Sequence, residues 1–151
     1  MAKGSPSLTA SHCSSRGGPA LRTTGRQAST WPRPSLSAHV FRGATTQRDP
    51  ETFDPLGTVD VHRDGDAIDR LNELECIGDH VVANVWQTDE IVVIDPASGT
   101  VQATIDASIL SEEIDSNDGG AVLNGIADPG DGTLLLAGKL WPVHFIVRIV
   151  G

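Results

Sequence analysis

Side chains that could do chemistry gather at one end of a predicted hairpin, residues 71–88. Asn72 lies at its start, and Trp86 and Gln87 lie at its finish. An amide donates and accepts hydrogen bonds, and an indole ring provides an apolar wall. The same residues also have structural uses, because an Asn often bonds nearby backbone and a Trp often packs in a core. A purely structural hairpin has little use for a Trp beside a Gln at a strand exit, so we predict a pocket floor.

The hairpin is one of several short strands that the sequence predicts. Two β-prone runs, 71–77 and 80–86, flank the turn signal Gly78-Asp79. The apolar run 91–94 (IVVI) predicts a buried strand, and 100–105 alternates as a half-exposed strand does. Between residues 110 and 120 we expect an acidic loop with at most one helical turn, at 111–113. The fold class predicted is therefore all-β.

The last segment of the chain repeats the hairpin. Residues 123–126 (LNGI) match 71–74 (LNEL) at an offset of 52 residues, and the strand at 133–138 leads to Lys139, Leu140 and Trp141 much as the earlier strand leads to Trp86. Residues 145–150 (FIVRIV) take the place of IVVI. Self-similarity at about 40–50 residues, with about four short strands in each unit, is typical of β-propeller blades. The sequence predicts about two blades.

Charge divides the chain into two dissimilar parts. Residues 1–50 carry seven basic side chains and one acid, whereas residues 51–151 carry four basic side chains and nineteen acids. The acidic part argues against nucleic acid as a partner, since binding needs a cationic surface for the phosphates. No apolar stretch approaches the roughly 20 residues of a membrane span, so we expect no membrane insertion.

Residues 1–47 are rich in Ser, Thr, Arg, Gly and Pro, and show no sustained apolar periodicity. This composition predicts a disordered segment. Three origins fit it: an Arg- and Ser-rich targeting segment, a basic tail for anionic partners, or the product of a frameshift or mis-called start. The segment lacks the continuous apolar core of a secretory signal, so export by that route is not expected and no compartment is assigned.

The two cysteines, Cys13 and Cys76, lie in the two dissimilar parts, which argues against a disulfide framework. Cys76 lies in an alternating strand and is expected to be a small core residue. No cluster of Cys and His has the spacing of metal ligands.

Five motifs in order, LNELE, ANVWQT, IDPASG, VLNGIA and GKLWP, resemble the glutamine cyclotransferase family, the plant and bacterial type of glutaminyl-peptide cyclotransferase. The resemblance covers residues 48–151. It implies a five-bladed β-propeller with the active site at one mouth of its channel, of which this chain has the C-terminal blades. The implied activity is conversion of the N-terminal glutamine of a peptide to pyroglutamate with release of ammonia, without a metal or other cofactor.

By motif match, Asn72, Trp86 and Lys139 occupy the family's active-site positions. A carboxylate would move the proton from the attacking amine to the leaving ammonia. Asn72 would stabilise the oxyanion, Trp86 would hold the glutamine side chain, and Lys139 would pair with the carboxylate. The family's carboxylate lies in an earlier motif of the Tyr-Glu-Ser-Thr-Gly kind, which has no counterpart here.

Two hypotheses remain open at this stage. In the first, the chain is an inactive fragment of a cyclotransferase, and its open blade edges favour self-association. In the second, it is a non-catalytic β-sheet interaction module. An essential Glu near Trp86 in the fold would favour the enzyme.

Overall fold

The computed structural model describes residues 10–11, 35–39, 43–49, 51–114 and 119–149. The described residues form short strands and one short helix, which confirms the all-β class. No helix among them is long and apolar enough to cross a membrane. The elements in chain order are β1 (Ala10–Ser11), β2 (Ser35–His39), β3 (Ala44–Arg48), β4 (Pro55–Asp60), β5 (His62–Arg63), β6 (Asp66–Ala67), β7 (Leu71–Ile77), β8 (His80–Val85), β9 (Glu90–Ile94), β10 (Val101–Asp106), α1 (Ser108–Glu113), β11 (Val122–Ala127), β12 (Leu134–Lys139) and β13 (His144–Val147).

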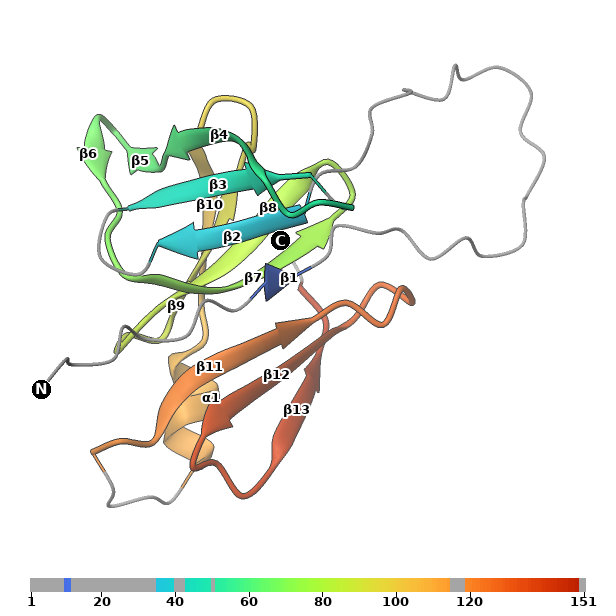
Figure 1. Ribbon diagram of the computed structural model, residues 1–151. Helices are drawn as coiled ribbons and strands as arrows, with labels where there is room; N and C mark the ends of the chain where they lie inside the picture. Colours follow the sequence, from blue (N-terminus) through green and yellow to red (C-terminus); the bar gives the residue numbers. More distant parts are fainter. Residues whose placement is uncertain (1–9, 12–34, 40–42, 50, 115–118, 150–151) are drawn as a thin grey trace, which may run out of the picture.

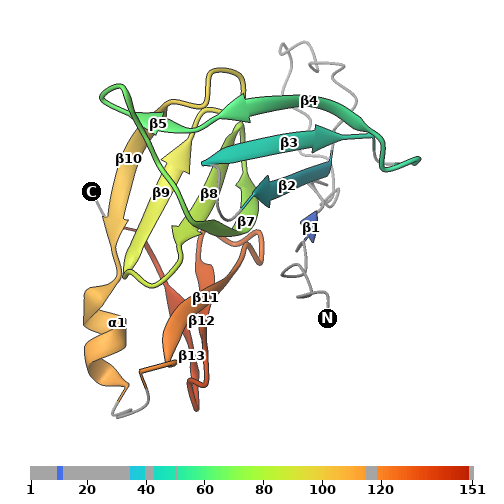
Figure 2. The same cartoon turned by 60° about the vertical axis from the view of Figure 1, so that its left-hand side comes forward.

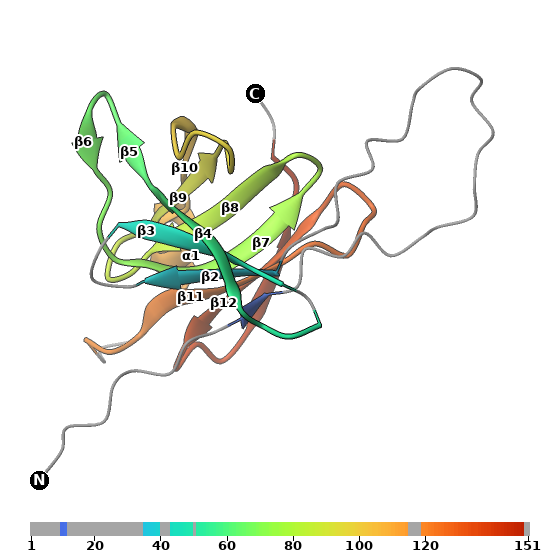
Figure 3. The ribbon, with the colours of Figure 1, turned by 45° about the horizontal axis from the view of Figure 1, so that its top comes forward.

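The strands form three antiparallel sheets in which sequence neighbours pair. The first sheet has the order β1-β2-β3-β4, the second has β7-β8-β9-β10, and the third has β11-β12-β13. The small hairpin of β5 and β6 joins the first sheet to the second and projects from the body of the molecule (Figures 1 and 3). Strand β7 contacts β1 and β2 of the first sheet and β11 of the third.

The β7–β8 hairpin forms where the sequence predicts it. Gly78 in its turn has φ 59°, a conformation that glycine adopts without steric cost. Strand β8 is buried on both faces, with Val81, Ala83 and Val85 on one side and Val82 and Asn84 on the other. Such a strand needs a packed layer on each side.

Two clusters of apolar side chains provide these layers. The first lies on the side of the second sheet that faces the β4–β7 connection, and comprises Val61, Ile68, Leu71, Leu74, Val81, Ala83, Val85, Val92 and Ile94. The second lies between the second and third sheets, and comprises Val82, Ile91, Ala107, Leu123, Ile126, Leu134 and Leu136. The second sheet is therefore the central layer.

The one described helix, α1, connects β10 to β11 at one end of the sheets (Figure 2). It extends the helical turn predicted at 111–113 to six residues, Ser108–Glu113. Its start is held because the Ala107 N–H donates to the Asp89 carbonyl at 2.8 Å. The Ser111 hydroxyl also donates to the Asp89 carboxylate. The loop after β8 thus supports the helix.

The first sheet crosses the N-terminal boundary predicted at residue 48, because β2 precedes that residue, β3 ends at it and β4 follows it. Strand β3 pairs with β4 in register from Ala44 opposite Asp60 to Gln47 opposite Gly57, and the register then shifts so that Arg48 lies opposite Pro55. Thr45 and Thr46 are buried despite their polarity, and the Thr46 hydroxyl hydrogen-bonds that of Thr58 at 3.2 Å. Strand β3 has no apolar pattern of its own, and it forms because β4 pairs with it. Apart from β1 and Gly43, the remainder of residues 1–47 lies outside the described residues.

Cys76 is disulfide-bonded, so the argument against a disulfide is wrong, whereas its side chain is partly buried and packs against the first apolar cluster, as expected of a small core residue. The sequence argument rested on the unlike composition of the segments that hold the cysteines. A disulfide requires only that two Cβ atoms come within about 4 Å, and composition does not encode that proximity. The position of Cys13 lies outside the described residues.

Candidate active site

Asn72 lies in a β-bulge of β7. Leu71 pairs with Val85 and Leu74 pairs with Ala83, so Asn72 and Glu73 together lie opposite the single residue between these partners, on β8. A bulge bends the strand and redirects its side chains, and bulges are frequent beside active sites. The sequence places Asn72 at the start of a strand but does not reveal the bulge.

Asn124 lies in the corresponding bulge of β11. Leu123 pairs with Gly138 and Gly125 pairs with Ala137, which leaves Asn124 as the additional residue. The Asn72 amide nitrogen donates to the Asn124 amide oxygen across the gap between β7 and β11. Asn124, which occupies in the repeat 123–126 the position that Asn72 has in 71–74, is therefore part of the same cluster as Asn72.

Trp86 and Lys139 occupy equivalent positions in the two sheets. The Trp86 N–H donates to the carbonyl of Arg70, the residue before β7, at 2.8 Å, and Lys139 pairs with Val122, the first residue of β11. The residue after each of them has a left-handed backbone: Gln87 has φ 64° and Leu140 has φ 62°. The repeat therefore matches Trp86 with Lys139. The comparison of the strand ends in the sequence suggested Trp141 as the counterpart of Trp86. The strand pairing does not support that match.

The three predicted site residues thus lie at one end of the sheets, where β7 and β11 begin and β8 and β12 end. Trp86 is half-buried and Lys139 is exposed. Among the described residues, a hydrogen bond joins Asn72 to Asn124, but none joins Lys139 to Asn72 or to Trp86. The structure brings the three to the same end without joining them directly.

A buried amide that the sequence did not single out supports this end. Asn84 is fully buried. Its Oδ1 accepts from the Glu73 N–H at 2.9 Å, and its Nδ2 donates to the Leu123 carbonyl at 2.8 Å. A buried polar side chain with both ends bonded in this way fixes its neighbours. The motif ANVWQT contains Asn84, but nothing in the motif distinguishes it from a strand residue.

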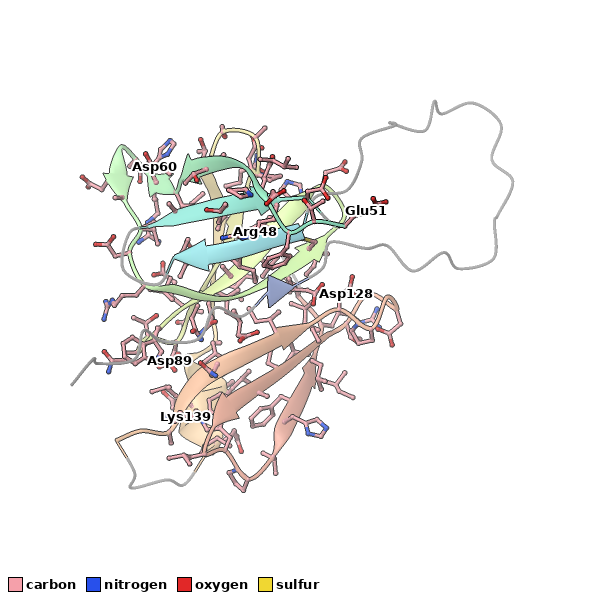
Figure 4. All side chains as sticks on the ribbon, in the orientation of Figure 1. Arg48, Glu51, Asp60, Asp89, Asp128 and Lys139 are labelled. Atoms are coloured by element: carbon pink, nitrogen blue, oxygen red, sulfur yellow. The ribbon has the colours of Figure 1, made fainter. Side chains whose placement is uncertain are left out.

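The charged groups of the two ends differ. Figure 4 shows Lys139 and Asp89 on the α1 side of the molecule, and Asp128 at the opposite side. Near Asp128, burial raises the pKa of the Glu75 carboxyl, and the negative charges of Asp128 and Glu73 raise it further, while hydrogen bonds from the Cys76 and Asp128 N–H groups oppose the change. Arg148 lies at the same end as Asp128, because hydrogen bonds from Thr133 and the charge of Arg148 lower the pKa of the Asp131 carboxyl in the β11–β12 turn. Lys139, by contrast, is a cation at the end that holds Asn72 and Trp86.

No group of three or more His, Cys, Asp or Glu side chains among the described residues has the geometry of a metal site. The donors that converge at the candidate site are the amides of Asn72 and Asn124. Such a cluster suits hydrogen bonding to a polar, uncharged group or to an oxyanion.

The model of the family described as glutamine cyclotransferase matches residues 43–149. The chain belongs to the glutamine cyclotransferase family. The match begins at residue 43, just before β3, whereas the sequence analysis places the boundary at residue 48.

Two relatives of this family are similar to the chain. A glutaminyl-peptide cyclotransferase of Arabidopsis thaliana is 38% identical over 104 residues, which are 67% of this chain and 32% of the relative. The crystal structure of Myxococcus xanthus glutaminyl cyclase matches with a TM-score of 0.73 and 37% identity, over 78% of this chain and 52% of that one. The chain thus spans about a third of the plant relative and about half of the bacterial one.

Proposed function

We propose that this chain is part of a glutaminyl-peptide cyclotransferase that converts the N-terminal glutamine of peptides to pyroglutamate. The observation that carries the proposal is the pair Asn72–Asn124, which joins two repeats at the end of the sheets that also holds Trp86 and Lys139. Membership of the family and similarity to two proteins named for this activity support it.

We further propose that the three sheets are successive blades of a five-bladed β-propeller. Each sheet is an antiparallel meander, the second packs face to face on the third, and its last strand leads through α1 to the first strand of the next. Strands β7 and β11, which begin two successive sheets, lie beside one another, as inner strands of neighbouring blades do. Residues 43–149, together with β1 and β2 of the first sheet, would then belong to the C-terminal blades.

The chemistry requires the α-amine of glutamine to attack its own side-chain amide carbon. The carbonyl oxygen becomes an oxyanion, and the amide nitrogen leaves as ammonia after accepting a proton. One Asn72 N–H is held by Asn124, so the second N–H of the same amide can point to the oxyanion. Trp86 forms an apolar wall that keeps the side chain folded for attack, and Lys139 pairs with the carboxylate that transfers the proton.

That carboxylate is the missing part. The sequence contains no tyrosine, so no motif of the Tyr-Glu-Ser-Thr-Gly kind occurs in it. We therefore propose that the 151-residue chain binds the substrate end of a glutaminyl peptide but does not turn it over. The decisive assay measures ammonia release from a glutaminyl dipeptide by the purified chain. Turnover that persists after contaminating enzyme is excluded would refute inactivity.

Binding is tested separately from turnover. Calorimetric titration with a glutaminyl dipeptide should give saturable binding, and the matched dipeptide that already carries pyroglutamate is the control ligand. Trp86→Phe should weaken binding, whereas Trp141→Phe, at the other Trp near this end of the sheets, should leave it unchanged. If the wild-type chain neither binds the glutaminyl dipeptide nor releases ammonia, the proposed function fails for this chain.

The second candidate function, an interaction module, has one observation in its favour. The outer face of the third sheet is apolar at Ala127, Leu135 and Ile146, and Ile146 is 71% exposed. Strand β12 reads LLLAGK, and a strand apolar on both faces is normally covered on both. In a complete propeller another blade would cover this face. In the isolated chain we propose that it promotes self-association.

A further inference from the structure

The two bulges at the candidate site are linked through a third residue. In β7 the bulge leaves Asn72 and Glu73 opposite Asn84 alone. A bulge disrupts the ladder locally, so its backbone groups need other partners. The Asn84 Oδ1 supplies one of them, because it accepts from the Glu73 N–H at 2.9 Å.

The other end of the same amide reaches the second bulge. The Asn84 Nδ2 donates to the carbonyl of Leu123, the residue before Asn124, at 2.8 Å. Glu73 is likewise the residue after Asn72. A single side chain therefore holds the backbone next to each of the two asparagines that bond each other. At the equivalent place on β12 the third sheet has Ala137, which faces the uncovered side.

The two partners define what the side chain must be. An N–H requires an acceptor and a carbonyl requires a donor, so only a group with both, at this length, satisfies Glu73 and Leu123 together. An ionised carboxylate provides no donor for the carbonyl, and an isosteric leucine provides neither bond. Because Asn84 is fully buried, water cannot replace a lost partner cheaply.

We propose that Asn84 is a positioning residue that sets the Asn72–Asn124 pair in place for the substrate amide. The proposal rests on the proposed function for its catalytic meaning, but its geometric part stands independently. Asn84 does not reach the substrate: both ends of its amide are bonded to backbone within the protein. Asn72 and Asn124 would make the contacts, and Asn84 would fix their separation.

The test uses three variants of the full chain: Asn84→Asp, Asn84→Leu and the control Thr46→Val. Thr46 is also a buried, hydrogen-bonded polar residue, but it lies on β3, away from both bulges. The readout is the set of ¹H–¹⁵N signals of the Asn72 and Asn124 side-chain amides, measured as a function of pH. Circular dichroism shows whether each variant is folded.

A protonated aspartic acid at position 84 can donate to the Leu123 carbonyl and still accept from Glu73, whereas its ionised form cannot donate. Burial raises the pKa of a carboxyl at such a site. In Asn84→Asp the two amide signals should therefore match the wild type at acidic pH and shift in a single titration as pH rises. In Asn84→Leu they should be displaced at every pH, and in Thr46→Val they should not move.

Unchanged Asn72 and Asn124 signals in folded Asn84→Asp and Asn84→Leu would overturn the proposal. If Asn84→Leu does not fold, the titration of Asn84→Asp carries the test. Failure of both variants to fold at any pH would make Asn84 an ordinary structural residue and would equally overturn it. Glutaminyl dipeptide binding, measured in parallel, should weaken in Asn84→Asp over the same pH range. Absence of binding by the wild type would count against the proposed function alone.

Discussion

Replacing Gly138 with alanine tests how the chain beside Lys139 is shaped. Strand β12 ends in a turn in which the Trp141 ring folds back over Gly138, and the Trp141 N–H donates to the Gly138 carbonyl at 3.3 Å. A Cβ added at Gly138 would lie 2.1 Å from the ring atom Cδ2 of Trp141. Ordinary van der Waals contact begins near 3.4 Å, so the ring would have to move by more than 1 Å.

The magnitude follows from what holds the ring. Trp141 packs against the cluster between the second and third sheets, and meets the Phe145 ring edge-on, with centroids 5.8 Å apart. Losing an aromatic pair costs about 0.5–1.5 kcal/mol, and overpacking of this kind typically costs about 1–3 kcal/mol. Removing a glycine from a strand returns about 0.5–1 kcal/mol. The steric effect is larger, and we expect a net loss of about 2 kcal/mol in the free energy of unfolding.

The assay is urea unfolding followed by far-ultraviolet circular dichroism, with Gly57→Ala as the control. Gly57 has nothing within 4 Å of an added Cβ and does not have positive φ, so its substitution should be neutral or slightly stabilising. A double-mutant cycle isolates the cause. In a Trp141→Ala background the clash is absent, and Gly138→Ala should no longer destabilise. An equal loss in both backgrounds, or no loss in the wild type, would refute the argument.

Three further predictions concern the packing of the sheets and their charges. Leu123→Ala, fully buried between the second and third sheets, should cost about 2–5 kcal/mol in urea unfolding, and a loss below about 1 kcal/mol would contradict the packing described. Because the pKa of the Glu75 carboxyl is raised in the fold, the free energy of unfolding should fall as pH rises from 4.5, the ordinary pKa, through the raised pKa. Glu75→Gln should therefore stabilise the fold at pH 7 but not below pH 4.5. Equal effects of the substitution at the two pH values would contradict this. Ile146→Lys should reduce self-association in light scattering, whereas Ile109→Lys, exposed on α1, should not; equal effects would place the contact elsewhere.

Local patterns predicted much of the fold. The runs at 71–77, 80–86 and 91–94 form β7, β8 and β9, and the run at 100–105 corresponds to β10 at Val101–Asp106. These segments alternate or are continuously apolar, and sit between turn residues, so the signal is within each segment. Strand β3 was missed for the complementary reason: its residues ATTQR form a strand because β4 pairs with them.

The candidate site was predicted in part. The motif match selects Asn72, Trp86 and Lys139, and the structure brings them to one end of the sheets, but their roles remain predictions. The bulges, the Asn72–Asn124 bond and the links made by Asn84 depend on the packing of one sheet on another. No local pattern reports such contacts, because a bulge is a difference in register between two strands and not a property of either alone.

The repeat itself explains why the two halves of the site are not interchangeable. Each half supplies an asparagine from a bulge and a residue at the end of the second strand, but that residue is an aromatic Trp86 in one sheet and a cationic Lys139 in the other. Asn84 in the first half reaches the next sheet, whereas its equivalent, Ala137, has none to reach among the described residues. We infer that the backbone of the repeat was kept while the side chains at its end diverged. One repeat thus ends its second strand in an apolar ring, and the other ends it in a cation.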